Sequence, residues 1–600
     1  MRDFTRPALW APRANRVDLI VDETPRPMRP DAERAGWWIT DAALEPGSRY
    51  AFSLDGGSPR PDPRSLAQPD GPHGASRIVD PAAIDRPQWE GINLRGGVLY
   101  ELHVGTFTDE GTFDAAIGKL DHLVELGVDA VEVMPVADFP GRWGWGYDGV
   151  GQYAVHQAYG GPEAFVRFID ACHERGLGVL LDVVYNHLGP EGNYLAEFGP
   201  YFTDEHQTPW GAALNLDQEH ADEVRAFFLG AARQWIADFQ CDGLRLDAVH
   251  ALVDDSKRHF LAEIADESLA WEQELGRPLF ITAESDLNQP SMVSPTNSVA
   301  FARGMDAQWA DDVHHALHAF FTGETQGYYV DFGTAEVLDK ALTRVFIHDG
   351  TYSTFRGKDW GAPVEPTTPL YDAQSFITFI QNHDQVGNRA AGDRLRDADR
   401  QAAAAALLLL APFTPLIFMG EEWAASTPFP FFADLGPELA PLVSEGRARE
   451  FAEMGWSDEV PDPQAESTFA SAKLRWDERE SEGHRRMLEW YRALIALRRV
   501  LPGATDPSLD TTAVEVVDAD TVLMHRPGFT VAATRGDAQV EVPLDGKILA
   551  TWGDAAQNPD GRWLLPGAGA IVVQAEGVIN GLRVQRLCAR FFGIPRRIPA

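Results

Sequence analysis

The feature that most constrains this chain is an alternation between two hydrophobic patterns, which runs from residue 98 to residue 499. Short runs rich in apolar and β-branched residues recur eight times, and stretches with helical periodicity separate most of them. The eight runs are 98–107, 130–136, 178–187, 243–249, 279–285, 305–311, 376–383 and 415–423. Unbroken apolar strands are typical of parallel sheets whose two faces are both covered. The middle of the chain is therefore expected to bury a parallel sheet.

The segments between and after these runs have the spacing of amphipathic helices. The helix candidates are 113–126, 162–175, 219–239, 256–275, 334–346, 399–411 and 482–499. Eight strands that alternate with helices predict an α/β fold, a (β/α)8 TIM barrel. An open, doubly wound sheet is the alternative that the alternation leaves open.

The two ends of the chain differ from this middle part. Residues 1–88 have short alternating segments between Pro- and Gly-rich turns, which predicts an N-terminal β-sandwich similar to a carbohydrate-binding module. The barrel is expected over 89–503, and the same strand and turn signals predict a C-terminal antiparallel β-domain over 504–575. The last segment, 576–600, carries arginines but no acidic residue from residue 577 onward. We interpret it as a disordered or docked end, with a partner-binding segment as the alternative.

Charge and cysteine content exclude several classes of protein. The formal net charge is −39, and an acidic surface repels nucleic acid and anionic membranes. The substrate is therefore expected to be neutral or cationic. The three cysteines are an odd number in a long chain and do not form a disulfide framework. No apolar run reaches the length of a membrane span. With no leader-like apolar segment at the N-terminus, we expect a cytoplasmic protein.

Polar residues end several of the apolar runs. In a TIM barrel the carboxyl ends of the strands converge on one mouth, where the active site lies. The third run ends in Asp-Val-Val-Tyr-Asn-His (182–187), the fourth contains Arg-Leu-Asp (245–247), the fifth contains Ala-Glu (283–284) and the seventh is followed by Asp384 after Asn-His (382–383). Several carboxyl groups, an arginine and two histidines at one mouth are suited to cleaving a glycosidic bond.

The roles of the carboxyl groups follow from their neighbours in sequence. A retaining glycosidase needs one ionised carboxylate as nucleophile and one carboxylic acid with a raised pKa as proton donor. Arg245 lies on the same face of its strand as Asp247 and would keep that carboxylate ionised, so Asp247 is the predicted nucleophile. Glu284 follows an apolar run and has no basic residue near it in sequence, so it is the predicted acid. Asp384 is then expected to stabilise the cationic sugar ring.

Four of these segments, 182–187, 243–250, 283–285 and 379–384, resemble the signature regions of the α-amylase superfamily of retaining glycoside hydrolases. By position, the resemblance gives Asp247, Glu284 and Asp384 the same three roles. It implies that His187, Arg245 and His383 bind the sugar beside the cleaved bond. Tyr147 in the segment 145–149 matches the aromatic platform for that sugar.

Within this superfamily, longer segments resemble the maltooligosyltrehalose trehalohydrolases. These segments are 100–108, 145–154, 186–195, 307–315, 381–389 and 420–429, and the resemblance extends over about residues 5–573 but not over the tail. It implies hydrolysis of the α-1,4 bond next to a terminal trehalose unit of maltooligosyltrehalose. It also implies that the segment from Trp309 to Asp312, with His314 and His315, helps to bind the trehalose side. For Asp311 and Asp312, the alternative is that they favour the start of a helix.

The substrate-binding residues expected from these arguments are Tyr147, His187, Arg245, His250, Trp309, Asp311, Asp312, Gln381, Asn382 and His383. No cofactor and no metal are expected: His314 and His318 are one helical turn apart but lack a third ligand in sequence. A maltooligosyltrehalose synthase is the functional partner that the resemblance implies. A glucan-branching enzyme or another α-glucanotransferase is the alternative function within the superfamily, and an inactive glucan-binding barrel is the alternative outside enzymes.

Overall fold

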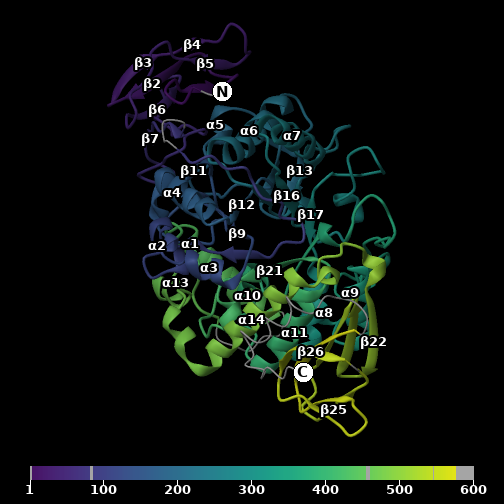
Figure 1. Ribbon diagram of the computed structural model, residues 1–600. Coiled ribbons are helices and arrows are strands. Elements are labelled where there is room, and N and C mark those ends of the chain that lie inside the picture. The colour runs from purple at the N-terminus through teal and green to yellow at the C-terminus, as the bar shows by residue number, and fades with distance from the viewer. Residues whose placement is uncertain (1–2, 82–85, 454–459, 545, 576–600) are drawn as a thin grey trace.

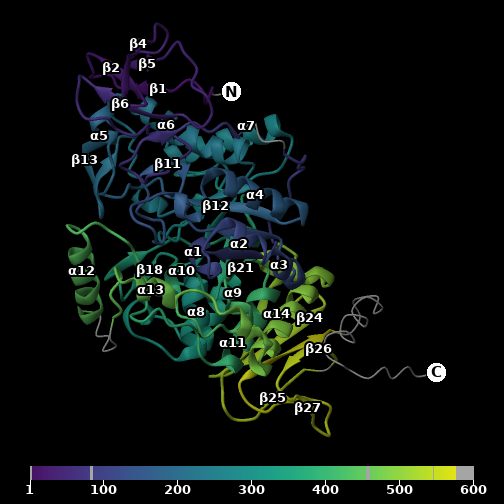
Figure 2. The same cartoon turned by 90° about the vertical axis from the view of Figure 1, so that its left-hand side faces the viewer.

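The computed structural model describes residues 3–81, 86–453, 460–544 and 546–575. Figure 1 shows the N-terminal strands at one end of an elongated molecule and the C-terminal strands at the opposite end, with the helix-covered barrel between them. Figure 2, turned by a quarter, shows the same order along the long axis. The barrel therefore separates the two smaller β-structures.

Eight parallel strands close into a barrel in the middle of the chain. They are β8 (Leu99–Leu102), β9 (Ala130–Val133), β12 (Gly178–Val183), β15 (Gly243–Leu246), β16 (Phe280–Ala283), β17 (Ala307–Trp309), β20 (Phe376–Phe379) and β21 (Thr414–Phe418). Each of the eight predicted runs overlaps one of these strands. The first strand, β8, pairs with both β9 and β21, which closes the sheet. The barrel prediction is confirmed, and the open sheet is excluded.

The inside of the barrel changes from apolar to charged along the strands. Leu99 and Ala130 pair in register and belong to an apolar cluster near the amino-terminal ends of the barrel strands. Two residues further on, and thus on the same inward face, Glu101 and Glu132 pair in register. Leu180 of β12 likewise belongs to the apolar cluster, and Asp182 lies two residues beyond it. The strand sequences therefore build a buried set of charged groups toward the mouth of the barrel.

Helices follow most of the barrel strands. They include α2 (Phe113–Ile117), α3 (Leu120–Leu126), α4 (Gly161–Glu174), α6 (Ala221–Arg233), α7 (Phe260–Leu275), α8 (Asp311–Thr322), α9 (Ala335–Arg344), α11 (Ala398–Leu410) and α14 (Glu482–Val500). The single helix expected over 113–126 is divided in two at Gly118, where a glycine disfavours a helix interior. The sequence did not predict α8, because the run before it extended the expected strand to residue 311.

The N-terminal part forms two small antiparallel sheets from seven strands. They are β1 (Ala8–Trp10), β5 (Trp37–Ile39) and β4 (Arg29–Pro30) in one sheet, and β3 (Thr24–Pro27), β2 (Val17–Val21), β6 (Arg49–Leu54) and β7 (Ser76–Arg77) in the other. This arrangement agrees with the short alternating strands expected there. The boundary at residue 88 stays a prediction.

The C-terminal part is antiparallel, as expected. A five-stranded sheet contains β22 (Ala513–Asp518), β23 (Thr521–Arg526), β24 (Phe529–Thr534), β29 (Gly569–Gln574) and β26 (Lys547–Trp552). A smaller sheet contains β25 (Val540–Val542), β28 (Trp563–Leu565) and β27 (Ala556–Gln557). The basic segment 576–600 lies outside the described residues.

Two hairpins were not predicted from the sequence. One, formed by β13 (Phe202–Thr208) and β14 (Gly211–Leu214), is inserted after β12. The other, formed by β18 (Thr351–Ser353) and β19 (Lys358–Trp360), lies between β17 and β20. Among the described residues, no helix combines the length and the apolar character needed to cross a membrane.

Candidate active site

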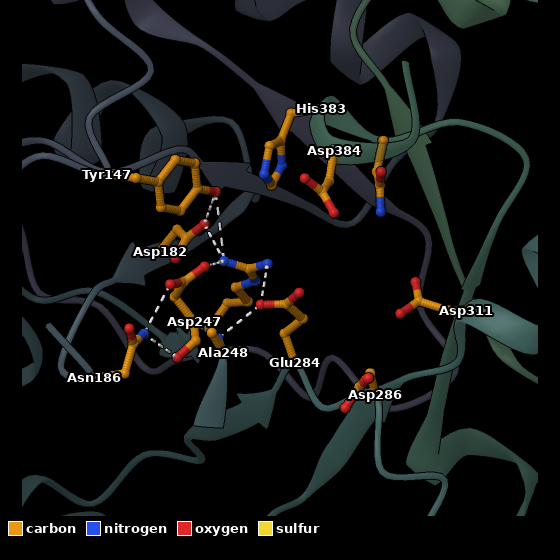
Figure 3. Close-up of polar contacts among 12 residues, drawn as sticks. Tyr147, Asp182, Asn186, Asp247, Ala248, Glu284, Asp286, Asp311, His383 and Asp384 are labelled. Carbon is orange, nitrogen blue, oxygen red and sulfur yellow. Dashed lines mark hydrogen bonds and ion pairs between the residues drawn. The ribbon is translucent and has the colours of Figure 1, made fainter. Parts of the chain in front are cut away.

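The predicted catalytic residues meet in one cavity at the carboxyl ends of the barrel strands. Its volume is about 760 Å³. Eight of the residues expected at the site line it: Tyr147, His187, Arg245, Asp247, His250, Glu284, His383 and Asp384. Figure 3 shows Tyr147, Asp247, Glu284, His383 and Asp384 projecting toward one another, from the segment between β9 and β12 and from the carboxyl ends of β15, β16 and β20. The barrel closure thus brings together residues that are up to 237 positions apart, as 384 minus 147 gives.

Arg245 is the centre of this arrangement. Its guanidinium lies 2.7 Å from Asp182, 2.9 Å from Asp247 and 3.1 Å from Glu284. It is 1% exposed, and its other face lies 4.2 Å from the ring centroid of Trp309. One buried cation therefore contacts three carboxyl groups, which fixes their relative positions and offsets part of their mutual repulsion.

Asp247, the predicted nucleophile, follows β15 directly. Its Oδ1 accepts a hydrogen bond from Arg245, and its Oδ2 accepts one of 2.8 Å from Nδ2 of Asn186. These two hydrogen bonds fix the orientation of the carboxyl group. The geometry therefore suits a carboxylate held in place for attack. Asn186 was not among the site residues expected from the sequence.

Glu284, the predicted acid, follows β16. The backbone N–H of Ala248 donates a hydrogen bond of 2.7 Å to its Oε2. Ala248 has a φ of +38°, an unfavourable backbone conformation for an alanine that presents this N–H to the glutamate. Burial raises the pKa of Glu284, although Arg245 acts in the opposite direction. The arginine is a spatial neighbour that the sequence did not reveal, and burial outweighs it.

Asp384 lies in the short helix α10 (His383–Gly387), which begins shortly after strand β20 ends. Burial raises the pKa of Asp384, and the neighbouring His383 lowers it. The ring of His383 stacks on Tyr147 with a centroid distance of 5.0 Å. Its Nδ1 lies 2.6 Å from Oε1 of Glu101 in β8. Sequence analysis did not single out Glu101, because its partner lies 282 residues further along the chain.

Asp182 joins Tyr147 to this network. The hydroxyl of Tyr147 donates a hydrogen bond of 2.6 Å to Oδ2 of Asp182, the same oxygen that Arg245 contacts. Burial raises the pKa of Asp182 to about 7, although Arg245 lowers it. Asp182 was noted as the start of a motif but not as a site residue. Its place on the inward face of β12 was the signal that could have identified it.

His187 and the hairpin β13–β14 form one wall of the cavity. The imidazole of His187 stacks on Trp210 of the hairpin with a centroid distance of 4.3 Å. Burial lowers the pKa of His187 to about 4, so the ring is neutral at neutral pH. Trp210 is 51% exposed and also lines the cavity. An exposed indole at such a wall offers a face on which a sugar can stack.

The other expected substrate-binding residues do not line the cavity. Trp309 is buried beneath Arg245, and Gln381 is buried in the barrel. The side chain of Asn382 accepts a hydrogen bond from the backbone of Gln385 and caps α10. The structure therefore places these residues behind the cavity wall, and their role in binding stays a prediction.

Asp311 and Asp312 begin helix α8, which was the alternative to sugar binding. Oδ2 of Asp312 accepts hydrogen bonds from the backbone N–H groups of Ile347 and His348 and from Asn288. Asp312 thus supports a neighbouring loop. Asp311 points toward Glu284 and Asp384 in Figure 3, and burial raises its pKa well above the usual value, with these two acids acting in the same direction.

One group within the described ranges has ligand atoms spaced as in a metal site: His206, Asp217 and Asp255. None of the three lines the cavity, and Nε2 of His206 already contacts Oδ2 of Asp217 at 2.7 Å. His314 and His318 are both buried, and Nε2 of His318 contacts Glu324 at 2.9 Å. Neither histidine lines the cavity.

Comparison with known proteins identifies the family. Residues 76–210 match the family model of the alpha amylase catalytic domain. A malto-oligosyltrehalose trehalohydrolase from Arthrobacter ramosus is 48% identical to this chain, over 95% of the chain and 99% of the relative. The malto-oligosyltrehalose trehalohydrolases of Mycobacterium tuberculosis H37Rv and Saccharolobus solfataricus are 46% and 45% identical, over 91% and 82% of this chain and 95% and 84% of their own.

Solved structures agree with this result. A crystal structure of an alpha-amylase-like protein from Salmonella typhimurium has a TM-score of 0.87 at 40% identity, covering 95% of this chain and 97% of its own. The catalytic module of the glycogen-degrading protein SpuA has a TM-score of 0.70 at 18% identity, covering 96% of each chain, and shares the fold. The family expected from the sequence motifs is confirmed: the chain belongs to the malto-oligosyltrehalose trehalohydrolase family of glycoside hydrolases.

Proposed function

We propose that this enzyme hydrolyses the α-1,4-glucosidic bond next to the terminal α,α-trehalose unit of maltooligosyltrehalose, releasing trehalose and a maltooligosaccharide. The observation that carries the proposal is the similarity to a malto-oligosyltrehalose trehalohydrolase over 95% of this chain and 99% of the relative. A 1,4-alpha-glucan branching enzyme from Pseudomonas fluorescens is 31% identical over only 42% of this chain. Full-length similarity therefore favours hydrolysis next to trehalose over branching.

In this mechanism the acid and the nucleophile act on one bond. Glu284 gives its proton to the glycosidic oxygen while a carboxylate oxygen of Asp247 attacks the anomeric carbon. The bond from that carbon to the glycosidic oxygen breaks, trehalose leaves with the proton, and the glucan remains bound to Asp247 as a glycosyl ester. Glu284, now ionised, takes a proton from a water molecule, and the water oxygen displaces Asp247 from the same carbon. Asp384 stabilises the positive charge that develops on the sugar ring. Retention of configuration requires that the two carboxyl groups lie about 5–5.5 Å apart.

Product analysis tests the reaction. The enzyme is incubated with maltotriosyltrehalose and, in parallel, with maltopentaose, a plain maltooligosaccharide of the same number of sugars. We expect trehalose and maltotriose from the first substrate and much slower cleavage of the second. Equal rates on both substrates would indicate a general α-amylase, and release of no trehalose would contradict the proposal.

The alternatives predict different products. A branching enzyme would form new α-1,6 linkages from amylose, which chromatography after debranching detects. An inactive glucan-binding barrel would bind without turnover, and the presence of Asp247, Glu284 and Asp384 around one cavity is the observation against it. We also propose that a maltooligosyltrehalose synthase supplies the substrate. A cytoplasmic location is supported by the buried, unpaired thiols of Cys172 and Cys241.

A further inference from the structure

A carboxylate from the first barrel strand lies directly behind His383. Glu101 is 1% exposed, and its Oε2 accepts a hydrogen bond of 2.8 Å from the backbone N–H of His383. Its other oxygen, Oε1, lies 2.6 Å from Nδ1 of the same residue. We propose that Glu101 is a positioning residue that holds His383 as an imidazolium with Nε2 toward the substrate, and that it acts on the proposed hydrolysis through His383.

The two contacts fix both the backbone and the ring of His383. A single carboxylate holds the first residue of α10 and the Nδ1 side of the imidazole, so the ring cannot turn without losing a buried hydrogen bond. Tyr147 stacks on one face of the ring, and the edge of Trp145 lies at a centroid distance of 5.4 Å. His383 lines the cavity. With Nδ1 bound to Glu101, Nε2 is the nitrogen that remains for a ligand.

The surroundings of His383 favour its charged form. Burial lowers the pKa of His383, but the charge and hydrogen bond of Glu101, together with Asp384, raise it above the usual histidine value. Arg245 acts against this rise. The titratable and charged groups that face His383 from the packed elements are Glu101, His103, Tyr147, Asp182, Arg245 and Asp384. Glu101 is the one among them that makes a hydrogen bond to its ring.

An imidazolium at this position serves the reaction in two ways. Its Nε2–H can donate a charge-assisted hydrogen bond to a hydroxyl of the bound sugar, which a neutral ring with Nδ1–H cannot do. Its charge also lowers the pKa of Asp384, which burial otherwise raises. The imidazolium therefore favours the ionised form of Asp384 beside the sugar ring on which positive charge develops. Glu101 contributes to both effects without contacting the substrate.

The first test measures the charge of His383 directly and needs no substrate. The full-length protein is labelled with ¹³C at the histidine Cε1 position, and its signals are followed by NMR as a function of pH, with His383→Gln to assign the signal. In the wild type we expect a midpoint above about 6.5, the usual histidine value. In Glu101→Gln the midpoint should fall by at least about one pH unit, and in Glu101→Asp, which keeps the charge, by less.

The chain offers a matched control for this substitution. Glu422 is 0% exposed and its Oε1 lies 2.8 Å from Nε2 of His122, so it is also a buried glutamate bound to an imidazole. It does not line the cavity. Glu422→Gln should leave the midpoint of His383 unchanged. A His383 midpoint that is the same in the wild type and in Glu101→Gln would overturn the proposal, as would a wild-type midpoint below about 6.

The second test asks whether Glu101 acts through His383. We expect Glu101→Gln to lower kcat/KM about 10- to 100-fold. In a His383→Gln background the same change should lower it less than about threefold, because the group that Glu101 positions is already absent. Equal losses in both backgrounds would assign Glu101 a purely structural role and refute the proposal.

The outcomes separate this proposal from the proposed function. If the wild type releases no trehalose but cleaves another α-glucan, only the proposed substrate fails, and the double-mutant comparison is made on the substrate that is cleaved. If Glu101→Gln does not fold, as judged by circular dichroism, the wild-type titration and Glu101→Asp decide. The proposal would also be contradicted if Glu101→Asp kept the wild-type titration midpoint of His383 but had a kcat/KM as low as that of Glu101→Gln.

Discussion

At the scale of single residues, the site depends on two carboxyl groups with different surroundings. Glu284 has a raised pKa because it is buried, whereas Asp247 is held by Arg245 and Asn186. The sequence predicted both residues, because each follows an apolar run that had to be a strand. It did not predict Glu101, Asp182 or their partners. Those roles depend on contacts across the barrel, which no pattern within one strand reveals.

We predict that Asp247→Ala and Glu284→Gln each lower kcat by a factor of about 10² to 10⁴. Neither change should lower the thermal unfolding temperature substantially, because both side chains point into the cavity. The measurement is the initial rate of trehalose release alongside circular dichroism melting. A variant with near wild-type turnover would contradict the role given to that residue.

The raised pKa of Glu284 predicts how activity depends on pH. The acid must be protonated in the free enzyme, so kcat/KM should be retained below its pKa and lost as the pH rises through it. Because burial raises this pKa, the midpoint of the alkaline limb should lie above about 4.5, the usual glutamate value. A pH profile of kcat/KM measures it. An alkaline midpoint at or below the usual value would exclude Glu284 as the acid.

Glu132 gives a prediction about stability. It is 1% exposed, and neither carboxyl oxygen has a hydrogen-bond partner among the described residues. Burial raises its pKa, and Glu101 acts in the same direction. A carboxyl group whose pKa is raised by folding destabilises the fold increasingly as the pH rises from about 4.5 toward the raised value.

Glu132→Gln removes this titration. We expect the free energy of unfolding of the variant, relative to that of the wild type, to increase by at least about 1 kcal/mol when the pH rises from 4.5 to 7. The reason is that one pKa unit corresponds to about 1.4 kcal/mol. Denaturant unfolding at both pH values measures the difference. If the gap between variant and wild type is independent of pH, Glu132 is not a neutral acid in the folded protein.

At the scale of helices and strands, much of the fold could be predicted from the sequence. All eight expected runs overlap a barrel strand, because a strand covered on both faces has to be apolar along its length. The hairpins β13–β14 and β18–β19 could not be predicted, since most of their residues are exposed or only partly buried and lack a hydrophobic period. Helix α8 was missed because the run 305–311 extended the expected strand to residue 311, where the helix already begins.

Arg498 connects three elements and predicts a large effect on stability. It is 2% exposed and donates hydrogen bonds from α14 to backbone carbonyls of Gly96, Leu409, Ala411 and Phe413. Two of these carbonyls lie at the end of α11, where helical carbonyls lack partners. Removing the guanidinium would leave several buried acceptors unsatisfied.

We expect Arg498→Ala to lower the free energy of unfolding by about 3–5 kcal/mol. The neighbouring Arg499 is a matched control, because its side chain is 52% exposed and contacts Gly127 and Asp129 at the surface. Arg499→Ala should lower the free energy of unfolding by less than about 1 kcal/mol. Denaturant unfolding measures both, and equal costs would show that the buried contacts of Arg498 contribute little.

At the scale of the whole molecule, one side chain ties the C-terminal sheet to the barrel helices. Trp552 at the end of β26 is 4% exposed, and its Nε1 donates a hydrogen bond of 2.7 Å to Asp399 of α11. Its ring lies 5.8 Å from that of Trp490 in α14, and the guanidinium of Arg486 lies 3.9 Å from its centroid. The C-terminal domain is therefore expected to unfold together with the barrel.

Trp552→Ala should uncouple the two parts. We expect the free energy of unfolding to fall by about 3–5 kcal/mol. In calorimetry, the C-terminal sheet should unfold in a separate transition at lower temperature than the barrel. Trp563→Ala, which alters the outer sheet where Trp563 pairs with Val542 and Gln557, serves as the control. It should leave a single main transition. One cooperative transition in Trp552→Ala would mean that other contacts are sufficient to join the parts.

The cluster around Arg245 also determines which glucans the enzyme can accept. The cation at the centre of the cavity is already bonded to Asp182, Asp247 and Glu284. A phosphate ester on the sugar at the cleaved bond would bring two further negative charges among these acids. Like charges at contact distance are strongly disfavoured in a buried site. We therefore expect that this enzyme does not cleave at a phosphorylated glucose unit of a glucan. Cleavage at unphosphorylated units of the same chain should be unaffected.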